Sequence, residues 1–277
     1  MKSQKISRRT ILDCALLATG ASLTAATAAA PGSKRVLALI GDRFHNPDYI
    51  RVGLDKVFSP LNLKVDYTIQ YDAISRDLLK NYQLLVILRD GMIWPNGYLG
   101  PDAYTAYEQG FENKKDFPET KSVLWMNEEQ GAAVKEFVNA GNGLYAMHNS
   151  SHISHSSKNF REVMGGAYIG HPTLRPFKVR AVNQDHPITQ GIEEFIVTDE
   201  QHYVEYDKDR KHILMEAENV DGLDYSGRGT KSISAWAYDY GQGRVAFTGV
   251  GHTVHALWNP QYLEVQRRSV RWLLKEL

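Results

Sequence analysis

The segment Arg35-Val-Leu-Ala-Leu-Ile-Gly-Asp42 decides the predicted fold. It is short, almost continuously apolar and ends in Gly-Asp, which is typical of a strand buried on both faces of a parallel sheet. After it, predicted helices at 49–58 and 75–80 alternate with predicted strands at 63–69 and 84–88. This β-α-β-α-β order predicts an α/β domain built around a parallel sheet.

The pattern is interrupted once and then resumes. Residues 90–121 mix Gly, Pro, Tyr and charged residues without a clear period, and the segment is longer than a usual connection, so we predict a functional insertion. The elements predicted beyond it are a helix at 128–139, a strand at 144–147, a short helix at 160–164, a strand at 177–182, a hairpin of 232–238 with 244–250, and a helix at 260–274.

The first thirty residues predict the compartment. Ser7-Arg-Arg-Thr-Ile-Leu12 is a twin-arginine pair before an Ala-rich apolar run, and small residues at Ala28–Ala30 suit a signal peptidase. A membrane anchor is the alternative, but Asp13 and several polar residues interrupt the run. We therefore expect a twin-arginine signal peptide over 1–30, no stable membrane anchor, and one periplasmic or secreted domain over 31–277.

Charge and cysteine content exclude several classes of function. The chain has 32 basic and 32 acidic residues. Removing the signal takes away mainly basic ones, so the mature protein is mildly acidic and shows no basic stripe for nucleic acid. Cys14 is the only cysteine and lies inside the signal. We therefore expect no disulfide, no thiolate metal ligand and no cysteine nucleophile.

Polar residues directly after predicted strands are the first candidates for a functional site. In open parallel sheets, ligands bind beyond the carboxyl ends of the strands, so such residues are expected to meet at one edge of the sheet. Four predicted strands contribute: Asp42, Arg43 and His45 after the first, Arg89 and Asp90 after the third, His148 and Asn149 after the fourth, and Gly251 and His252 after the last.

Histidines and one glutamate supply the remaining candidates. In His148–His155, offsets of four and three place His148, His152 and His155 on one helical face, a spacing that permits metal binding but also suits solvated or capping residues. Glu200 and His202 are two residues apart and share a face if the segment is extended, which makes Glu200 a candidate ligand or acid/base. We interpret His186, in Asp-His-Pro, mainly as part of a rigid turn.

Several familiar signatures are missing from the sequence. It contains no Gly-x-Ser-x-Gly elbow, phosphate-binding loop, His-Glu-x-x-His motif or dinucleotide fingerprint, which disfavours serine hydrolases, NTPases and dehydrogenases and predicts no nucleotide cofactor. Carboxylate and imidazole chemistry remains, alone or around a divalent ion. Neutral histidines suit zinc and neighbouring transition metals.

Five ordered motifs resemble the trehalose-utilisation (ThuA-like) family. They run from about residue 35 to 275 and read Gly141-Asn-Gly-Leu-Tyr-Ala-Met-His148-Asn-Ser, Gly170-His171-Pro172, Asp185-His186-Pro187-Ile-Thr-x-Gly191, Asp199-Glu200-x-x-Tyr203 and Gly241-x-Gly243-Arg-Val-x-Phe-Thr-x-x-Gly251-His252.

The resemblance implies a fold like that of class I glutamine amidotransferases: a single three-layer flavodoxin-like domain with a mostly parallel sheet. The region matching His148 lies near the place where the amidotransferases keep their nucleophilic cysteine. This sequence has no cysteine there, so amidotransferase activity is not carried over.

The resemblance also implies sugar catabolism, in pathways where a partner dehydrogenase first oxidises a glycoside to its 3-keto form. The ketone acidifies the neighbouring C–H bond, and a positioned His or Glu that removes the proton is typically worth about 100- to 10,000-fold. A metal or an arginine would stabilise the resulting charge. Isomerisation and β-elimination of the glycosidic oxygen both remain open.

The site residues predicted on these grounds fall into three sets. They are His148 and Glu200 as catalytic residues; His148, His171, Glu200 and His252 as ligands of zinc or manganese; and Asp42, Arg43, His45, Arg89, Asn149 and Tyr203 as contacts to a small carbohydrate.

Two other functions stay open at this stage. A metal-dependent hydrolase of an unoxidised glycoside or amide would use the same histidines to activate water. A non-catalytic carbohydrate-binding protein would stack sugar rings on aromatic residues, although aromatics at this spacing more often belong to the core. The aromatic candidates are Trp94, Tyr98, Tyr104, Tyr107 and Trp258.

Overall fold

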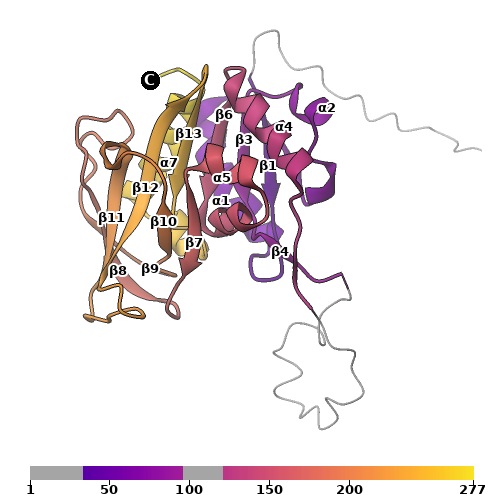
Figure 1. Cartoon of the computed structure of the whole chain (residues 1–277). Helices are drawn as coiled ribbons and strands as arrows, with labels where there is room; N and C mark the ends of the chain where they lie inside the picture. Colours follow the sequence, from indigo (N-terminus) through magenta and orange to yellow (C-terminus); the bar gives the residue numbers. More distant parts are fainter. Residues whose placement is uncertain (1–33, 96–120) are drawn as a thin grey trace, which may run out of the picture. The chain divides into compact units, whose positions relative to one another are not determined.

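The apolar segment after Lys34 forms strand β1 near one edge of a large central sheet in a computed structural model, which describes residues 34–95 and 121–277 (Figure 1). Five strands of this sheet are mutually parallel: β2 (Lys64–Thr68), β1 (Arg35–Ile40), β3 (Leu84–Leu88), β6 (Gly143–Met147) and β13 (Gly243–Thr248). The next four are each antiparallel to their neighbour: β12 (Lys231–Tyr240), β11 (Ile213–Asn219), β8 (Arg175–Ala181) and β9 (Phe195–Asp199).

Within the described residues the strand order is β2-β1-β3-β6-β13-β12-β11-β8-β9. The predicted α/β fold is confirmed, and the sheet is mixed, with one parallel and one antiparallel half. Two short pairs lie outside it: β7 (Gly166–Gly170) with β10 (Tyr203–Tyr206), and β4 (Met92–Ile93) with β5 (Val123–Leu124).

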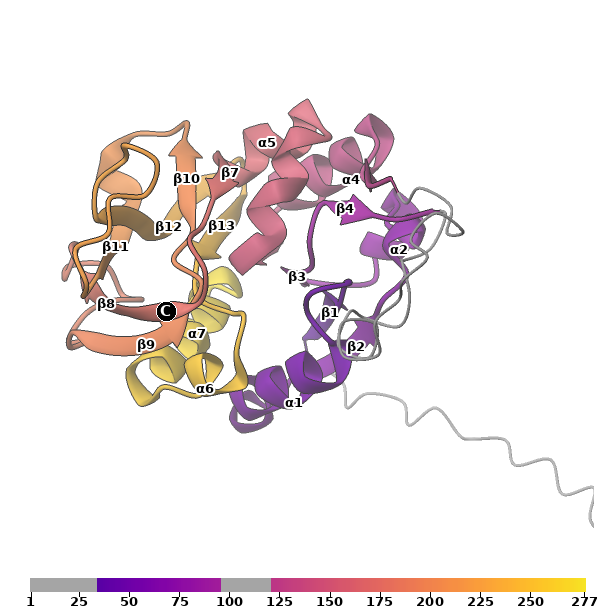
Figure 2. The same ribbon diagram turned by 90° about the horizontal axis from the view of Figure 1, so that it is seen from below.

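Helices cover both faces of the parallel half (Figure 2). One face packs on α1 (Pro47–Phe58), α6 (Val254–Leu257) and α7 (Pro260–Leu273); the other packs on α2 (Arg76–Leu79), α4 (Glu128–Asn139) and α5 (Lys158–Met164).

The apolar run of β1 explains these layers. Because successive strand side chains point to opposite faces, Val36, Ala38 and Ile40 join the core under α1 and α7. Leu37 and Leu39 join the core under α2 and α4. The strand therefore needs apolar residues at every position.

The connection from β1 to α1 is short and tightly packed. Gly41 has φ +82°, and a Cβ there would lie 2.6 Å from the Cβ of Pro47, so only glycine fits this turn. Asn46 then caps α1 by accepting a hydrogen bond from the backbone N–H of Asp48 at 2.8 Å, and Pro47 occupies the first turn. The turn fixes the residues just before the helix, including His45.

Most predicted elements are present. The structure adds six strands that were not predicted from the sequence: β4, β5, β7, β9, β10 and β11. Residues His148–His155 form a 3-10 helix, η4, rather than an α-helix.

The predicted signal peptide at 1–30, most of the predicted insertion at 90–121, and Tyr98, Tyr104 and Tyr107 lie outside the described residues. Within residues 34–95 and 121–277, no helix has the length and apolar character needed to cross a membrane.

Candidate metal centre

One carboxylate oxygen stands at the centre of a group of histidines. Glu200 directly follows β9, and its Oε2 lies 3.4 Å from Nε2 of His148 and 3.2 Å from Nδ1 of His252. Nε2 of His171 lies 3.5 Å from the same oxygen, and Nε2 of His202 lies 3.6 Å from it. Four imidazole rings thus face one oxygen atom.

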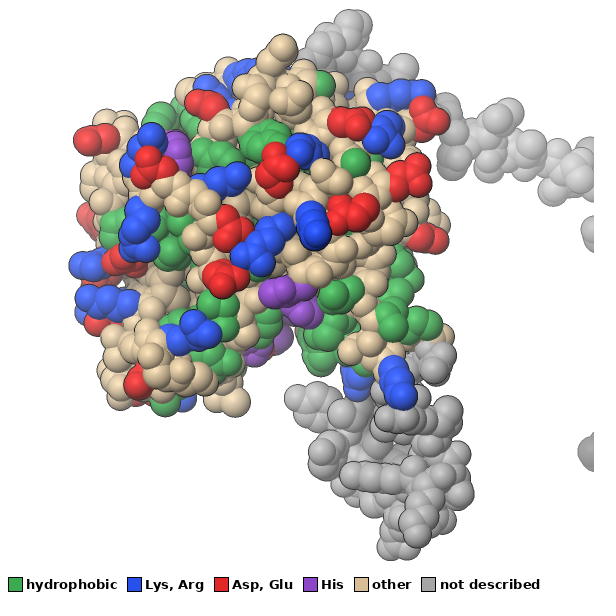
Figure 3. Space-filling model, viewed as in Figure 1, with side chains coloured by type: hydrophobic (Ala, Val, Ile, Leu, Met, Phe, Trp, Pro, Cys, Tyr) green, Lys and Arg blue, Asp and Glu red, His purple; other side chains and the backbone are tan. Residues whose placement is uncertain are grey.

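Strand ends bring these residues together. His45 follows β1, His148 follows β6, His171 follows β7, and His252 follows β13, while Glu200 and His202 lie between β9 and β10. Three of the side chains predicted to meet at one edge of the sheet do meet there: His45, His148 and His252. Nε2 of His45 lies 3.0 Å from Nδ1 of His252. Histidine side chains are visible at the lower edge of the molecule in Figure 3.

The backbone of His148 has an unusual conformation. Its φ is +51°, in the left-handed region that residues with a Cβ rarely adopt, directly after β6. Gly251 packs against it so closely that a Cβ at Gly251 would lie 2.7 Å from the Cβ of His148. The turn thereby directs the fully buried His148 ring toward Glu200.

Hydrogen bonds fix the tautomers of three histidines. Nδ1 of His148 lies 2.9 Å from the carbonyl oxygen of Gly249, and Nδ1 of His171 lies 2.8 Å from that of Pro172. A carbonyl oxygen only accepts, so each Nδ1 carries the proton. Nδ1 of His45 faces the Asp42 carboxylate in the same way, at 2.9 and 3.0 Å. In the neutral ring, each Nε2 then offers a lone pair.

Asp42 anchors His45 within a larger network. Its carboxylate also accepts from Nδ2 of Asn149 at 2.9 Å and from the backbone N–H of Asp90 at 2.8 Å. Burial acts to raise the pKa of Asp42, but the hydrogen bonds, above all that from His45, outweigh it and lower the pKa to about 2. Asp42 is therefore a carboxylate that orients His45, as partners of metal-bound histidines do.

The charges of the cluster favour a cation. Burial opposes ionisation of Glu200, yet the close imidazole rings of His148, His202 and His252 hold its pKa far below the usual range. Burial also opposes a proton on His148, but Glu200 and Asp199 more than compensate and raise its pKa. Burial and the nearby His148 lower the pKa of His202. The negative carboxylates thus attract positive charge to the centre of the cluster.

Three nitrogen atoms of the cluster lack hydrogen-bond partners. Among the described residues, Nε2 of His148 and both ring nitrogens of His202 are buried without a hydrogen bond. Such atoms require an explanation in a folded protein. The candidate ligands form two groups, and within each group all donor atoms lie within 4.8 Å of one another. The first group is His45, His148, Glu200 and His252. The second shares the glutamate and consists of His171, Glu200 and His202.

A cavity of about 340 Å³ opens beside the cluster. This size is within the range of small-molecule sites. Its walls include Glu200, four histidines of the cluster, and His152. Apolar surface comes from Phe44, which is 50 % exposed, and from Tyr168. His148 does not contribute to the walls, since it lies behind His202, with the two rings stacked at 3.9 Å.

The other predicted contact residues divide into two groups. Asn149 and the ring of His45 line the cavity. Asp42 supports His45, and the guanidinium of Arg43 lies 5.6 Å from the ring of Phe44 and 5.1 Å from that of Trp94.

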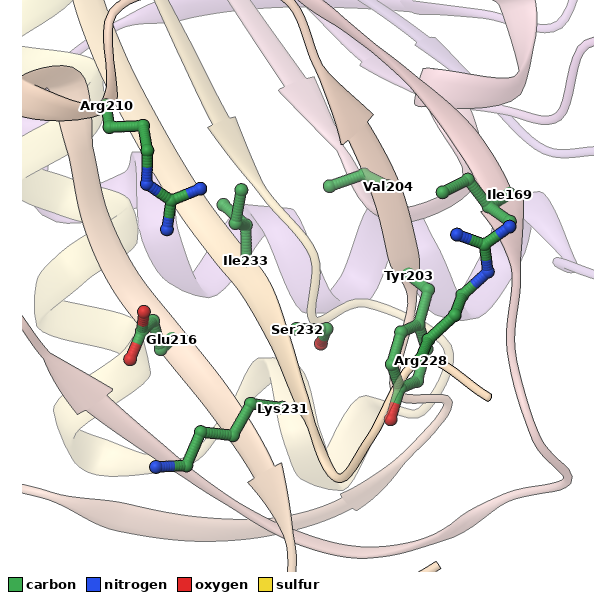
Figure 4. A pocket seen from close by; sticks show the side chains of 9 residues that line it. All are labelled: Ile169, Tyr203, Val204, Arg210, Glu216, Arg228, Lys231, Ser232 and Ile233. Atoms are coloured by element: carbon green, nitrogen blue, oxygen red, sulfur yellow. The ribbon is translucent and has the colours of Figure 1, made fainter. Parts of the chain in front are cut away.

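Arg89 and Tyr203 lie elsewhere. Arg89 is buried, donates to the carbonyl of Gly41 and covers the ring of Tyr71. Tyr203 is buried and donates to the carbonyl of Gly229 at 2.8 Å. It borders a separate cavity of about 270 Å³, around which Figure 4 shows Arg210, Arg228 and Lys231.

His202 was not among the predicted site residues, and His45 was predicted as a contact to the substrate. The spacing Glu200-x-His202 could have predicted that His202 lies beside Glu200 at the site. The pairing of His45 with His252 joins residues 207 positions apart and had no local signal.

Comparison with known proteins identifies a family for this chain. Residues 44–273 match a family model described as ThuA, trehalose utilisation. A comparison with curated proteins finds no match.

Solved structures share the fold. A ThuA-like protein from Parabacteroides merdae is 15 % identical, covers 87 % of this chain and 90 % of its own, and has a TM-score of 0.61. One from Bacteroides uniformis is 14 % identical over 90 % and 94 % of the two chains, with a TM-score of 0.59. A β-galactosidase from Rahnella sp. R3 is 13 % identical over 89 % of this chain but 32 % of its own, with a TM-score of 0.54.

Proposed function

Because this chain belongs to the ThuA trehalose-utilisation family, we propose that it is a carbohydrate-processing enzyme whose His–Glu cluster holds a divalent cation. Its substrate is a glycoside or the 3-keto derivative of one. The observation that carries the proposal is the convergence of four imidazole rings on Oε2 of Glu200 at 3.2 to 3.6 Å.

Hydrogen bonding alone does not account for this convergence. The tautomers of His148 and His171 present lone pairs to the glutamate, and two acceptors facing each other repel. One oxygen atom also does not accept four good hydrogen bonds. A cation among the donors satisfies the nitrogens and the carboxylate together.

The spacing of the donors supports the same conclusion. Bonds of about 2.1 Å in tetrahedral geometry place neighbouring ligand atoms roughly 3.4 Å apart. The separations are 3.4 Å for His148 and Glu200, 3.2 Å for His252 and Glu200, and 3.0 Å for His45 and His252. We therefore assign the ligand set to His45, His148, Glu200 and His252, with zinc or manganese as the metal. Its preponderance of imidazole donors favours zinc.

The outer partners of this set support the assignment. Asp42 holds His45, and the carbonyl of Gly249 holds His148, each through Nδ1. Metal-bound histidines almost always donate their other ring N–H in this way. His171 and His202, the other two histidines close to Glu200, line the cavity and are placed to contact the substrate.

A bound cation would polarise a substrate oxygen and stabilise negative charge that develops on it. The chain supplies the rest of the site. The exposed ring of Phe44 offers a flat apolar surface for a sugar ring, while Asn149 and Asp90 offer polar contacts to hydroxyl groups. A ketone next to a C–H bond fits this arrangement, because removing that proton places charge on the carbonyl oxygen.

We further propose that the protein is exported by its twin-arginine signal and works outside the cytoplasm. A sugar dehydrogenase that oxidises glycosides at C3 would supply the keto substrate. The motif at residues 8 and 9 supports export, and the family's link to trehalose utilisation supports a sugar substrate.

Metal analysis combined with a sugar panel tests the proposal. The mature protein, purified without chelator, is expected to hold one zinc or manganese ion per chain and to consume a 3-keto-glucoside. His148→Ala should lose both properties, while His255→Ala, which changes an exposed histidine, should keep them. Turnover of plain glycosides alone would point to a hydrolase, and binding without turnover to a sugar-binding protein. Absence of metal in the active wild type would overturn the metal assignment.

A further inference from the structure

A second polar unit, outside both groups of candidate ligands, faces the same cavity. Asp90 lies two residues after the end of β3 and His152 belongs to η4, and both line the cavity with Glu200 and His252. The 3-10 geometry of η4 separates His152 from His148: the His152 ring lies near Tyr168, with 5.3 Å between ring centroids, whereas His148 stacks on His202.

The two side chains form a well-defined pair. Nδ1 of His152 lies 2.8 Å from Oδ1 of Asp90, and the side chains are 16 % and 11 % exposed. The carboxylate accepts, so the proton is on Nδ1 and Nε2 carries the lone pair. Within the described residues, no hydrogen bond is made to Nε2 of His152. The exposed part of this ring therefore offers a base to the cavity.

Asp90 is held on several sides. Its Oδ1 also accepts from the backbone N–H of Met92 at 2.7 Å, and its carbonyl accepts from Nε1 of Trp125 at 2.8 Å. Its own N–H donates to Asp42, the residue that orients His45. The pair is thus tied rigidly to the candidate metal centre.

Gly91 permits the close approach. A Cβ at Gly91 would lie 2.9 Å from the backbone carbonyl carbon and oxygen of His152. A larger residue would push η4 away from the end of β3, and with it His152 from Asp90. The sequence therefore carries a glycine where this contact needs one.

The cluster itself is poorly suited to moving protons. Its donor atoms point at one another. Of the two predicted catalytic residues, His148 is fully buried and does not line the cavity, and the Glu200 carboxylate is enclosed by four imidazole rings. A group that exchanges protons with a substrate needs an exposed lone pair within reach of it. His152 lines the cavity, and its side chain is 16 % exposed, so it is placed for this role.

We propose that Asp90 and His152 form the proton-transfer dyad of the site, with His152 as the catalytic base and acid and Asp90 as its positioning residue. This inference rests on the proposed function for its substrate, a 3-keto-glycoside. Nε2 takes the proton from C2, and the electron pair of that C–H bond forms the C1–C2 double bond. The C1–O bond breaks, its electron pair stays on the departing oxygen, and the imidazolium returns the proton to that oxygen. No oxidant or reductant is needed.

Three variants of the full mature chain test the catalytic role. His152→Gln should lower turnover of the 3-keto-glucoside, and exchange of its C2 hydrogen in D2O, by about 100- to 10,000-fold, as loss of a general base does. Metal content and the unfolding temperature should stay those of the wild type. Added imidazole should restore part of the activity of His152→Ala. His155→Gln, on the same 3-10 helix but outside the cavity wall, is the control and should behave as wild type.

Chemical labelling tests the dyad without a substrate. Diethyl pyrocarbonate acylates unprotonated imidazole nitrogens, and peptide mass spectrometry follows each histidine. In the wild type, His152 should react rapidly. Asp90→Asn should slow this reaction by about tenfold or more, because an amide N–H favours the tautomer with the proton on Nε2.

The two readouts separate the dyad from the substrate assignment. Wild-type turnover in His152→Gln, or acylation of His152 at the same rate with and without Asp90, would overturn the dyad. A wild-type enzyme that consumes no keto or plain glycoside would instead defeat the proposed function, and the labelling result would still decide the dyad.

Discussion

Nε2 of His148 lies 3.4 Å from Oε2 of Glu200, while Nδ1 of the same ring is committed to the carbonyl of Gly249. The two residues come from strands β6 and β9, on opposite sides of the β13-β12-β11-β8 segment of the sheet. Their contact links the parallel and antiparallel halves of the sheet.

Replacing Glu200 by glutamine should abolish tight metal binding. The substitution keeps the shape and removes the charge, so zinc affinity should fall by more than the about 10- to 100-fold typical of outer partners. Competition titration with a zinc chelator measures the affinity. The matched control is Glu205→Gln, an exposed residue paired with Arg161 at 2.8 Å, where affinity should not change. Unchanged affinity in Glu200→Gln would remove Glu200 from the ligand set.

Replacing Asp42 by asparagine should weaken metal binding less than Glu200→Gln does. Its carboxylate fixes the Nδ1–H tautomer of His45, and the loss of such a partner typically costs about 10- to 100-fold in affinity. The same titration measures the change. Asp55→Asn provides a control at a half-exposed carboxylate that bonds Tyr67 and Arg51 far from the cluster. An Asp42→Asn variant that binds as poorly as Glu200→Gln would mean that Asp42 contributes more than orientation.

Placing a methyl group at Gly251 should disturb the cluster without changing any polar atom. The new Cβ would lie 2.7 Å from the Cβ of His148, so the ring must shift and zinc affinity should fall by about tenfold or more. Gly249→Ala serves as the control, because there the nearest heavy atom to the added Cβ is 3.5 Å away. Equal affinity for both variants would show that the position of His148 tolerates this shift.

Protonation of His186 should destabilise the fold as the pH falls. Burial, assisted by the charge of Arg244, lowers its pKa to about 4, and its Nδ1 accepts a hydrogen bond from the N–H of Ile188 at 3.2 Å. The unfolded chain takes up this proton near pH 6.5. The stabilisation is therefore complete above about pH 6.5 and is lost as the pH falls toward 4.

His186→Asn isolates this contribution. Denaturant unfolding of the variant should depend less steeply on pH than that of the wild type between pH 6.5 and 4. The difference should stay below about 3 kcal/mol, since solvent screens a partly exposed ring. Parallel curves for the two proteins would show that His186 titrates alike in the folded and unfolded states.

Much of the parallel half of the fold was predictable because its signals are local. The apolar run at 35–40 belongs to a strand covered on both faces, and Asn46-Pro47 and Asn127 through Gln130 mark helix starts by capping. The antiparallel half was predicted less well. Strands such as β9 have alternating buried and exposed residues over a short length, which resembles many irregular segments.

The sequence by itself determined the elements of the parallel half, the absence of thiol chemistry downstream of Cys14, and the polar residues that end the strands, because each depends on neighbours along the chain. It did not determine which of those residues meet. Only the tertiary structure decided that His45, His148 and His252 converge on Glu200, that His202 joins them, and that Arg89 and Tyr203 lie elsewhere. Three features of the tertiary structure set the directions of these side chains: the strand order in the sheet, the left-handed turn at His148 and the three-residue period of η4. Local spacing along the chain encodes none of the three.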